Sequence, residues 1–352
     1  MIRRIINSNP FLIKLLHWEY WPMSVVYFPL SIYYIYLSAR AGSFFFWSTS
    51  NPTIESGGMM FESKWSIFKL IPPQYFPKTI FVSENDTVED TFIALENSGI
   101  KYPFIAKPDR GERGWAIKKI ESAEQLKVYI QKSPVDFLIQ SFVDMPVELS
   151  VFYYRLPDQE RGTVSSVCFK ELLKANGNGK STLKELIMAN PRALLRLDAL
   201  KEQHAAEMDS VLPIGEEKLL VPLGNHCRGA TFFDYNHIID ESLIDVFDHI
   251  SKQIDGFYYG RYDLKCQSLE DLKAGKNISI VELNGAGAEP AHIYQPDYPL
   301  LKGQKDIFFH YKKLWEVSMA NARKGEKFMT IAEFRDLLRR QKAYKLKVNS
   351  AS

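Results

Sequence analysis

Apolar residues recur along the chain at two spacings, one typical of helices and the other of strands. From about residue 60, helical patterns cover Lys64–Ile71 and Thr87–Asn97, with Gly99 as a stop, and Ser122 can cap a helix that runs to about Lys132. Short runs of strand length stand between and after them. These predicted strands are Thr79–Val82, Tyr102–Lys107, Ala116–Ile120, Phe137–Ser141 and Glu148–Arg155.

The second half of the chain continues this pattern. A helical stretch is expected at 191–210. An amphipathic helix that ends at Gly256 is predicted for 240–255, because four apolar residues recur there at helical spacing: Leu243, Phe247, Ile250 and Ile254. Two more strands are predicted after it, Tyr258–Lys265 and Ile278–Asn284.

The composition is that of a globular protein with a substantial core. Of the 352 residues, 46% are hydrophobic and 24% are charged, and the formal net charge is only +2. Such a balance argues against a nucleic-acid-binding protein. The three cysteines are far apart without CxxC spacing, so neither a disulfide framework nor a zinc site is expected, and a reducing compartment is favoured. They are Cys168, Cys227 and Cys266.

Four polar residues stand out on the last two predicted strands. Residues two apart on a strand point to the same face, which pairs Arg261 with Asp263 and Glu282 with Asn284. If the two strands are neighbours, all four side chains converge. Two carboxylates and an amide oxygen suit Mg²⁺, and an arginine can contact a phosphate. The alternative is a surface salt bridge on an edge hairpin.

A second candidate is the segment Tyr102–Gly114, in which Lys107 ends an apolar strand before a glycine-containing loop. Backbone N–H groups of such a loop can cover phosphates, and the lysine adds a positive charge. Two other glycine motifs fail. Gly177–Thr182 has the end of a Walker A loop, but Lys174 stands where its first glycine belongs. Gly285–Gly287 starts like a dinucleotide fingerprint, but Pro290 takes the third glycine position.

In this order the segments resemble the ATP-grasp family, in particular its D-alanine–D-alanine ligase-like and cyanophycin-synthetase-like members, over about residues 60–300. The resemblance implies an α+β fold, with two α+β lobes clasping ATP. It makes Lys64 and Lys107 the two phosphate lysines, and Gly111 and Gly114 part of the mobile glycine loop. The implied adenine hinge and ribose acid are Gln140, Phe142, Val143 and Glu148. Arg261 becomes the phosphate arginine, and the implied magnesium ligands are Asp263, Glu282 and Asn284.

The implied organisation has three parts. Residues 1–59 form an aromatic N-terminal region in place of the Rossmann-like domain that such ligases normally carry, 60–320 form the ATP-grasp domain, and 321–352 form a basic helical tail. Two further departures are Gln140, where the ligases often have glutamate, and Asn178, which replaces an aspartate in the loop before Lys180. The missing domain puts the substrate in doubt, because that domain helps to form the substrate pocket.

The resemblance implies a cytoplasmic enzyme that uses ATP with Mg²⁺, or Mn²⁺, to phosphorylate a carboxylate and join it to an amine or a thiol. Lys180 is a weaker candidate cation for this chemistry. Arg228, with His226 beside it, could hold a substrate carboxylate or acyl phosphate; the alternative is a loop arginine and a structural histidine. Glu289 and His292 could line the substrate pocket; the alternative is that they belong to a turn with no role in binding. Two other functions remain open, a small-molecule kinase and an ATP-binding regulatory protein without turnover.

The N-terminal region carries an unusual aromatic run. No charged residue occurs from Trp21 to Ala39, and Pro22 and Pro29 interrupt the run. As a helix it would span roughly 28 Å, barely a bilayer core. Three alternatives stay open: a segment at the inner membrane surface that helps to bind a lipid-linked substrate, a buried aromatic core, and a true span. A span conflicts with the positive-inside rule, which would place the rest of the chain away from ATP.

The tail from Arg323 to Lys347 holds nine Lys and Arg against three acids, which predicts a basic helix. Such a helix is usually a solvated face. In the membrane alternative it could add attraction to anionic lipids.

Overall fold

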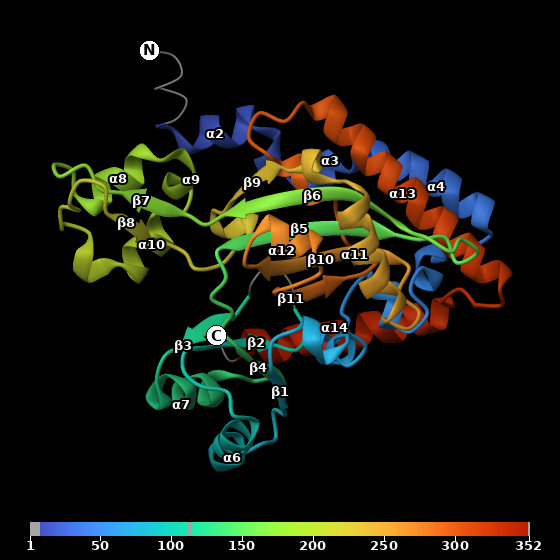
Figure 1. The fold of residues 1–352 in the computed structure, drawn as a ribbon, viewed down its shortest axis with the longest axis horizontal. Helices are drawn as coiled ribbons and strands as arrows, with labels where there is room; N and C mark the ends of the chain where they lie inside the picture. The colour runs from blue at the N-terminus through green and yellow to red at the C-terminus, as the bar shows by residue number, and fades with distance from the viewer. Residues whose placement is uncertain (1–7, 112–114, 351–352) are drawn as a thin grey trace.

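Two antiparallel sheets organise the computed structural model, which describes residues 8–111 and 115–350 (Figure 1). The four-stranded sheet has the order β1–β4–β2–β3, and its strands are β1 (Thr79–Val82), β2 (Phe104–Pro108), β3 (Lys118–Ile120) and β4 (Phe137–Ser141). The five-stranded sheet has the order β11–β10–β5–β6–β9, and its strands are β5 (Val147–Tyr154), β6 (Thr163–Glu171), β9 (Thr231–Asp234), β10 (Tyr259–Cys266) and β11 (Ile278–Asn284).

The smaller sheet and helices α6 (Val88–Ser98) and α7 (Ala123–Lys132) form the small lobe. Thr87 caps α6 with a capping box and Gly99, at φ 69°, ends it, while Ser122 caps α7 as predicted. Side chains from the two helices and the sheet make one buried core that includes Leu95, Phe104, Ile120, Leu126, Phe137 and Ile139.

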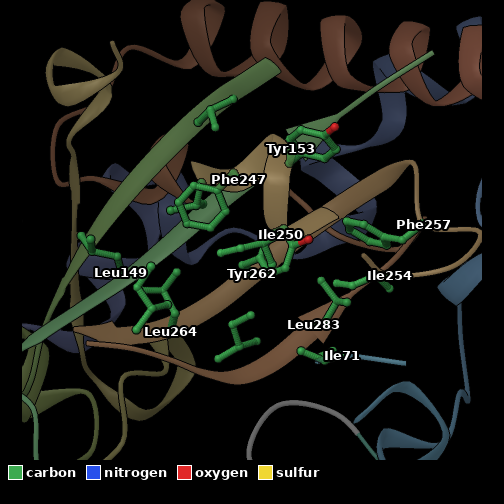
Figure 2. Packing of buried hydrophobic residues seen from close by; sticks show 14 of the residues in the cluster. Ile71, Leu149, Tyr153, Phe247, Ile250, Ile254, Phe257, Tyr262, Leu264 and Leu283 are labelled. Atoms are coloured by element: carbon green, nitrogen blue, oxygen red, sulfur yellow. The ribbon is translucent and has the colours of Figure 1, made fainter. Parts of the chain in front are cut away.

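The larger sheet is covered on one face by α11 (Glu241–Lys252), with α12 (Leu269–Lys273) and α5 (Lys64–Phe68) beside it. Asp240 caps α11, and the four apolar residues that predicted this helix are all buried. Figure 2 shows Phe247 and Ile250 beside Tyr262 and Leu264 of β10, with Phe247 and Tyr262 rings 5.3 Å apart. The predicted amphipathic helix is confirmed.

The opposite face of the larger sheet packs against helices from both ends of the chain. They are α13 (Leu300–Arg323), for which the sequence analysis named no element, and α4 (Phe28–Ala41). Phe152 and Tyr259 of the sheet contact Leu37 of α4 and Leu314 of α13 in one buried cluster. Two α+β lobes with a cleft between them are the architecture that the resemblance implies, so the predicted fold class is confirmed.

The N-terminal region is part of the large lobe. The Asn51 side chain accepts hydrogen bonds from the backbone of Tyr258 and Tyr259, at 2.9 and 3.0 Å, and donates one to Tyr259 O at 2.9 Å. The aromatic run divides into η1 (Trp18–Tyr20), α3 (Met23–Val26) and α4, after α2 (Pro10–Leu16). In the part of the chain that the structure describes, no helix has both the length and the apolarity to cross a membrane.

One predicted element is wrong in extent. The helix expected at 191–210 is broken into α9 (Pro191–Leu194), α10 (Leu197–Gln203) and η5 (Ala205–Glu207), because Arg196 and His204 leave helical geometry. The basic tail forms α14 (Ile331–Ser350), and its first turn packs against the N-terminal region, where the Phe334 and Phe45 ring centroids are 4.6 Å apart. Further along the helix, Arg340 pairs with Glu55 at 2.7 Å.

The remaining elements are short. A side unit beyond β6 consists of β7 (Lys174–Asn176), β8 (Glu217–Leu219), α8 (Leu183–Ala189), α9 and α10, around a core of its own. The other 3₁₀ turns are η2 (Phe46–Thr49), η3 (Glu55–Gly58), η4 (Pro73–Tyr75), η6 (His226–Arg228), η7 (Asn236–Ile238) and η8 (Ala291–Tyr294).

Candidate active site

A cleft of about 1180 Å³ opens between the two lobes. Its walls come from both sheets, from the loops around β8 and η6, from residues 19–23 of the N-terminal segment and from one side of α14. The small lobe contributes Lys107 and the hinge after β4, and the large lobe contributes the polar ends of β10 and β11. The cleft therefore gathers most of the residues that the sequence analysis selected.

The two polar strand pairs are neighbours, as predicted. β10 and β11 pair antiparallel, with Asp263 opposite Glu282 and Arg261 opposite Asn284. Arg261 binds Asp263 with two nitrogens, Nε to Oδ1 at 3.1 Å and Nη2 to Oδ2 at 3.0 Å, and Asn284 Nδ2 donates to Asp263 Oδ2 at 3.2 Å. Asp263 is only 5% exposed. A surface salt bridge is thus excluded for this group, because the aspartate lies inside the cleft wall.

Lys170 is a residue that the sequence analysis missed. It is buried on β6, and its Nζ lies 3.0 Å from Asp263 Oδ1. Burial alone would raise the pKa of Asp263, but Arg261 and Lys170 lower it well below the ordinary value of an aspartate, and Ser150 donates a hydrogen bond to the same carboxylate. Asp263 is therefore ionised, and the positive charges of Arg261 and Lys170 lie next to its carboxylate. No motif marks Lys170 in the sequence, and β6 was not predicted as a strand.

Glu282 differs from Asp263 in having an open carboxylate. It lines the cleft, and among the described residues no side chain or backbone group donates a hydrogen bond to it. Asp263, Glu282 and Asn284 offer two carboxylates and an amide on adjacent strands, which is a hard oxygen set that fits Mg²⁺, and Mn²⁺ equally. Across residues 8–111 and 115–350, no group of three or more His, Cys, Asp or Glu side chains is placed to hold a metal, so a metal here would depend on Asn284 and on phosphate oxygens.

Lys107 reaches from the small lobe to the large one. Its Nζ donates to Gln140 Oε1 at 2.8 Å and to the backbone oxygen of Val281, the residue before Glu282, at 2.9 Å. Burial lowers the pKa of Lys107 to about 7, with Glu282 acting against this and Lys64 adding to it. The Gln140 side chain is held by Thr79 at 2.9 Å and serves to position the lysine.

The second predicted lysine lies at the glycine loop. Lys64 Nζ donates to the backbone oxygen of Gly111 at 2.7 Å, and both residues line the cleft. Gly114 lies outside the described residues. Lys64 and Lys107 thus both line the cleft, close enough for the charge of Lys64 to lower the pKa of Lys107.

The predicted hinge follows β4. Phe142 and Val143 line the cleft, and the Phe142 ring lies under two ammonium groups, Lys119 at 5.1 Å and Lys265 at 5.7 Å from its centroid. Glu148 stands beyond the hinge with Lys265 3.7 Å away. The hinge and Glu148 therefore form one end of the cleft, with backbone groups and an acid available to a ligand.

The other end of the cleft is built by the N-terminal segment. Glu19 is 6% exposed at its side chain, lies 2.5 Å from Arg192 Nη2 and accepts a hydrogen bond from His226 at 2.9 Å. Tyr20 stacks on the His226 ring with centroids 5.7 Å apart. Burial lowers the pKa of His226, but its hydrogen bonds to Cys227 and Glu19 outweigh this, and the pKa is raised overall. No motif marked Glu19 or Arg192 in the sequence.

The same end carries a second acid. Glu289 accepts a hydrogen bond from Tyr27 at 2.5 Å and another from Tyr294 at 2.7 Å, and its backbone oxygen accepts one from Arg261 at 3.0 Å. The N-terminal segment thus reaches, through Tyr27, a residue that is bonded directly to Arg261. It forms one wall of this end of the cleft.

Three candidates are not brought into the cleft. Lys180 lies on the exposed loop between β7 and α8, where Asn178 Oδ1 accepts its backbone N–H at 3.0 Å. Arg228 is on η6 but is not among the residues that line the cleft. His292 is buried and bonded to Ser166 at 2.6 Å, so the structural reading holds for it. His226, Arg261 and Glu289 line the cleft.

Removing the Glu19 carboxylate should destabilise the N-terminal wall. Glu19→Ala leaves Arg192 and His226 buried without their acid, and we expect it to lower the free energy of unfolding by about 3 kcal/mol, measured by urea denaturation. Glu207→Ala is the matched control, because Glu207 also pairs with a lysine and a histidine, at 2.7 and 3.6 Å, but at the surface. Equal stability losses in the two variants would contradict the anchoring role of Glu19.

No protein-family model and no curated protein sequence matches this chain. Solved structures similar to it include a VanG D-Ala:D-Ser ligase from Enterococcus faecalis, with 15% identity and a TM-score of 0.42 over 74% of this chain and 62% of that one. A D-alanine–D-alanine ligase from Bacillus anthracis has 13% identity and a TM-score of 0.40 over 76% and 68%. A bifunctional glutathione synthetase from Pasteurella multocida has 14% identity and a TM-score of 0.35 over 70% and 35%.

Two of these three are D-alanine ligases by name. The chain spans less than two thirds of the first of them. At TM-scores of 0.35 to 0.42 these superpositions are too loose to assign an activity, so the chemistry has to be judged from the residues of the cleft.

Proposed function

We propose that this chain is an ATP-grasp enzyme that phosphorylates a carboxylate with ATP and joins the product to an amine, or less readily to a thiol. One observation carries the proposal. The Lys107 ammonium of the small lobe donates to Val281 O, and Val281 precedes Glu282 of the large lobe. A cation that can bind phosphate and a carboxylate that can bind a metal are therefore close together where the two lobes meet. A triphosphate with its metal needs both charges at one place.

In this proposal ATP lies along the cleft. Its adenine is held by the backbone of the hinge at Phe142 and Val143 and its ribose by Glu148, while Lys64 and Lys107 bind phosphates. Asp263, Glu282 and Asn284 would hold Mg²⁺, which when bound would neutralise phosphate charge. Arg261 stabilises the negative charge that develops on the transferring group, because a guanidinium can bind two of its oxygens at once.

The proposed reaction has two steps. A carboxylate oxygen of the substrate attacks the γ-phosphorus, the bond to the β-phosphate oxygen breaks, and ADP leaves with that electron pair. The amine nitrogen then attacks the acyl carbon, phosphate leaves, and the amine loses a proton. No side chain has to act as a nucleophile, so the protein contributes mainly positioning and electrostatics. The charged end of the cleft, with Glu289, Arg192 and His226, offers room for a second substrate and favours ligation over simple phosphorylation.

The proposal is tested by following ADP and trapping the acyl group. The purified chain is incubated with Mg²⁺, ATP and pools of carboxylates, with and without hydroxylamine. ADP release that depends on a carboxylate, together with a hydroxamate detected by mass spectrometry, supports a ligase. ADP release with a stable phosphorylated product and no hydroxamate supports the kinase alternative. ATP binding without any ADP release under all pools would leave only the regulatory alternative.

ATP binding should take up a proton near neutral pH. The pKa of Lys107 is lowered to about 7 in the free protein, mainly by burial, and phosphate charge beside the ammonium raises it. Above that pH the free lysine is largely neutral, so binding has to protonate it, and ATP affinity should fall as the pH rises from 7 to about 9. Calorimetry in buffers of different ionisation enthalpy measures the uptake. Lys107→Met should abolish it, and uptake that persists in this variant would assign it to another group.

A further inference from the structure

The outer side of the N-terminal segment is an exposed apolar face. On α4, Phe28, Ile32 and Ile35 are 68, 70 and 62% exposed, and they recur at helical spacing. On the opposite side of the same helix, Leu30 and Leu37 are buried against the large lobe. The helix is thus apolar on both sides, although only one side has a partner in this chain.

Neighbouring elements carry further exposed apolar residues, and we call the whole set the N-terminal apolar face. Ten of the 22 exposed large apolar side chains among the described residues belong to it, and α2, α3 and α4 lie along one edge of the molecule (Figure 1). Its members are Phe11, Leu15, Leu16, Met23, Val25, Phe28, Ile32, Ile35, Tyr36 and Phe44. Exposed apolar residues gathered in this way are uncommon on a protein surface that meets only water.

Positive charge borders the face. Between Met23 and Ala41 the only charged residue is Arg40, which is exposed at the end of α4, and exposed Lys14 is on α2. α13 packs beside α4 and presents further exposed lysines, Lys302, Lys305 and Lys312, of which the first and last lie 3.6 and 3.8 Å from an acid. The acids of that helix are engaged, since Asp306 accepts a hydrogen bond from Tyr298 at 2.8 Å and Glu316 pairs with Lys313 at 2.8 Å.

We propose that the N-terminal apolar face binds the surface of an anionic lipid membrane, with α4 lying in the interface. A helix of this kind buries its apolar side at the boundary of headgroups and acyl chains, and basic residues at its border are attracted to anionic headgroups. Aromatic rings and lysines at the rim suit the same boundary. A second copy of the chain would cover the apolar residues equally well, but the basic border would then meet its own like charge.

The cleft opens beside this surface. Met23 belongs to the apolar face and also lines the cleft, where Tyr20 and Trp21 precede it. Membrane binding would therefore place the substrate end of the cleft next to lipid. This consequence rests on the proposed function, and it assigns an amphiphilic or lipid-linked molecule as one of the two substrates. The membrane binding itself does not depend on that function.

Sedimentation with vesicles tests the proposal on the full-length chain. We expect it to bind vesicles of phosphatidylcholine mixed with phosphatidylglycerol, and to bind pure phosphatidylcholine less well. High salt should weaken the binding only in part, since apolar burial is not screened. The double variant Ile32→Glu/Ile35→Glu should bind at least about tenfold more weakly, because it puts charge where the acyl boundary lies. Ile32→Gln/Ile35→Gln is a milder form of the same change.

The matched control is Ile93→Glu/Val128→Glu, which alters two apolar residues that are 51 and 46% exposed on helices of the small lobe. It should bind vesicles like the unaltered chain. ATP affinity without lipid should be the same for every variant, which shows that each is folded and keeps the membrane test separate from the proposed function.

Three results would overturn the proposal. First, the unaltered chain could fail to sediment with anionic vesicles at low salt. The control variant could lose as much binding as the variants of α4. The chain could sediment in an ultracentrifuge as a dimer that becomes monomeric with Ile32→Glu/Ile35→Glu, in which case a second copy covers the face.

Discussion

Replacing Glu282 with glutamine should lower ATP turnover at least about a hundredfold while the protein unfolds at nearly the same temperature. The expected loss follows from the position of the carboxylate, opposite Asp263 and beside the carbonyl that binds Lys107. The expected stability follows from the lack of a hydrogen bond to Glu282 among the described residues, since the change removes only its electrostatic effect on Lys107 and Arg261. ADP release under saturating ATP measures the first quantity and calorimetric unfolding the second.

Glu282→Gln is a cleaner test than Asp263→Asn. Asp263 is paired with Arg261 and Lys170, so its replacement leaves two buried cations without an acid and destabilises the protein as well as the site. Glu171→Gln, an exposed strand residue on β6, is the matched control and should leave turnover unchanged. If Glu282→Gln needs a higher Mg²⁺ concentration than the unaltered chain for half-maximal turnover, the loss of turnover is due to weaker metal binding. Full turnover in that variant would refute the metal assignment.

Replacing Lys107 with methionine should weaken ATP binding roughly 10- to 100-fold, the value of a charge-assisted hydrogen bond to phosphate. Methionine has a similar length and suits a buried position whose ammonium lies 4.9 Å from the Phe68 ring centroid. AMP binding should change little, because the ammonium is expected to contact the outer phosphates. Titration of each nucleotide against the purified variant measures both.

Lys101→Met is the matched control for this substitution, since Lys101 is exposed and precedes the same strand. It should bind ATP as tightly as the unaltered chain. Equal losses of ATP and AMP affinity in Lys107→Met would instead indicate a folding role, in which Lys107 holds the lobes together through Gln140 and Val281.

Local pattern was sufficient for most of the elements around the site. The strands that carry Asp263 and Glu282 were predicted from short apolar runs, and the spacing of two along a strand placed Arg261 with Asp263 and Glu282 with Asn284. The helix at 240–255 was predicted because its apolar side repeats at helical spacing over several turns. β6 was not predicted, and with it Lys170 was missed, although this lysine lies 3.0 Å from the central aspartate.

Two assignments needed contacts that no local pattern contains. Lys180 was a candidate cation and Arg228 a candidate for holding a substrate carboxylate or acyl phosphate, yet the side unit holds Lys180 on an exposed loop, and Arg228 does not line the cleft. The basic tail forms a mostly exposed helix, as its composition predicts, but only the structure shows that Tyr344 of α14 donates to the backbone oxygen of Arg110 at 2.6 Å.

The sequence by itself determined where strands and helices form and which cations and carboxylates stand together on one strand, because spacing along a strand or helix decides which side chains share a face. Only the tertiary structure decided which segments share the cleft. Glu19 meets His226 across 207 residues of sequence, and Lys107 meets Val281 across 174. It also decided that one side of the aromatic run packs on the large lobe and the other stays exposed, since that depends on where α13 lies. Such contacts depend on the packing of whole lobes, which no short segment encodes alone.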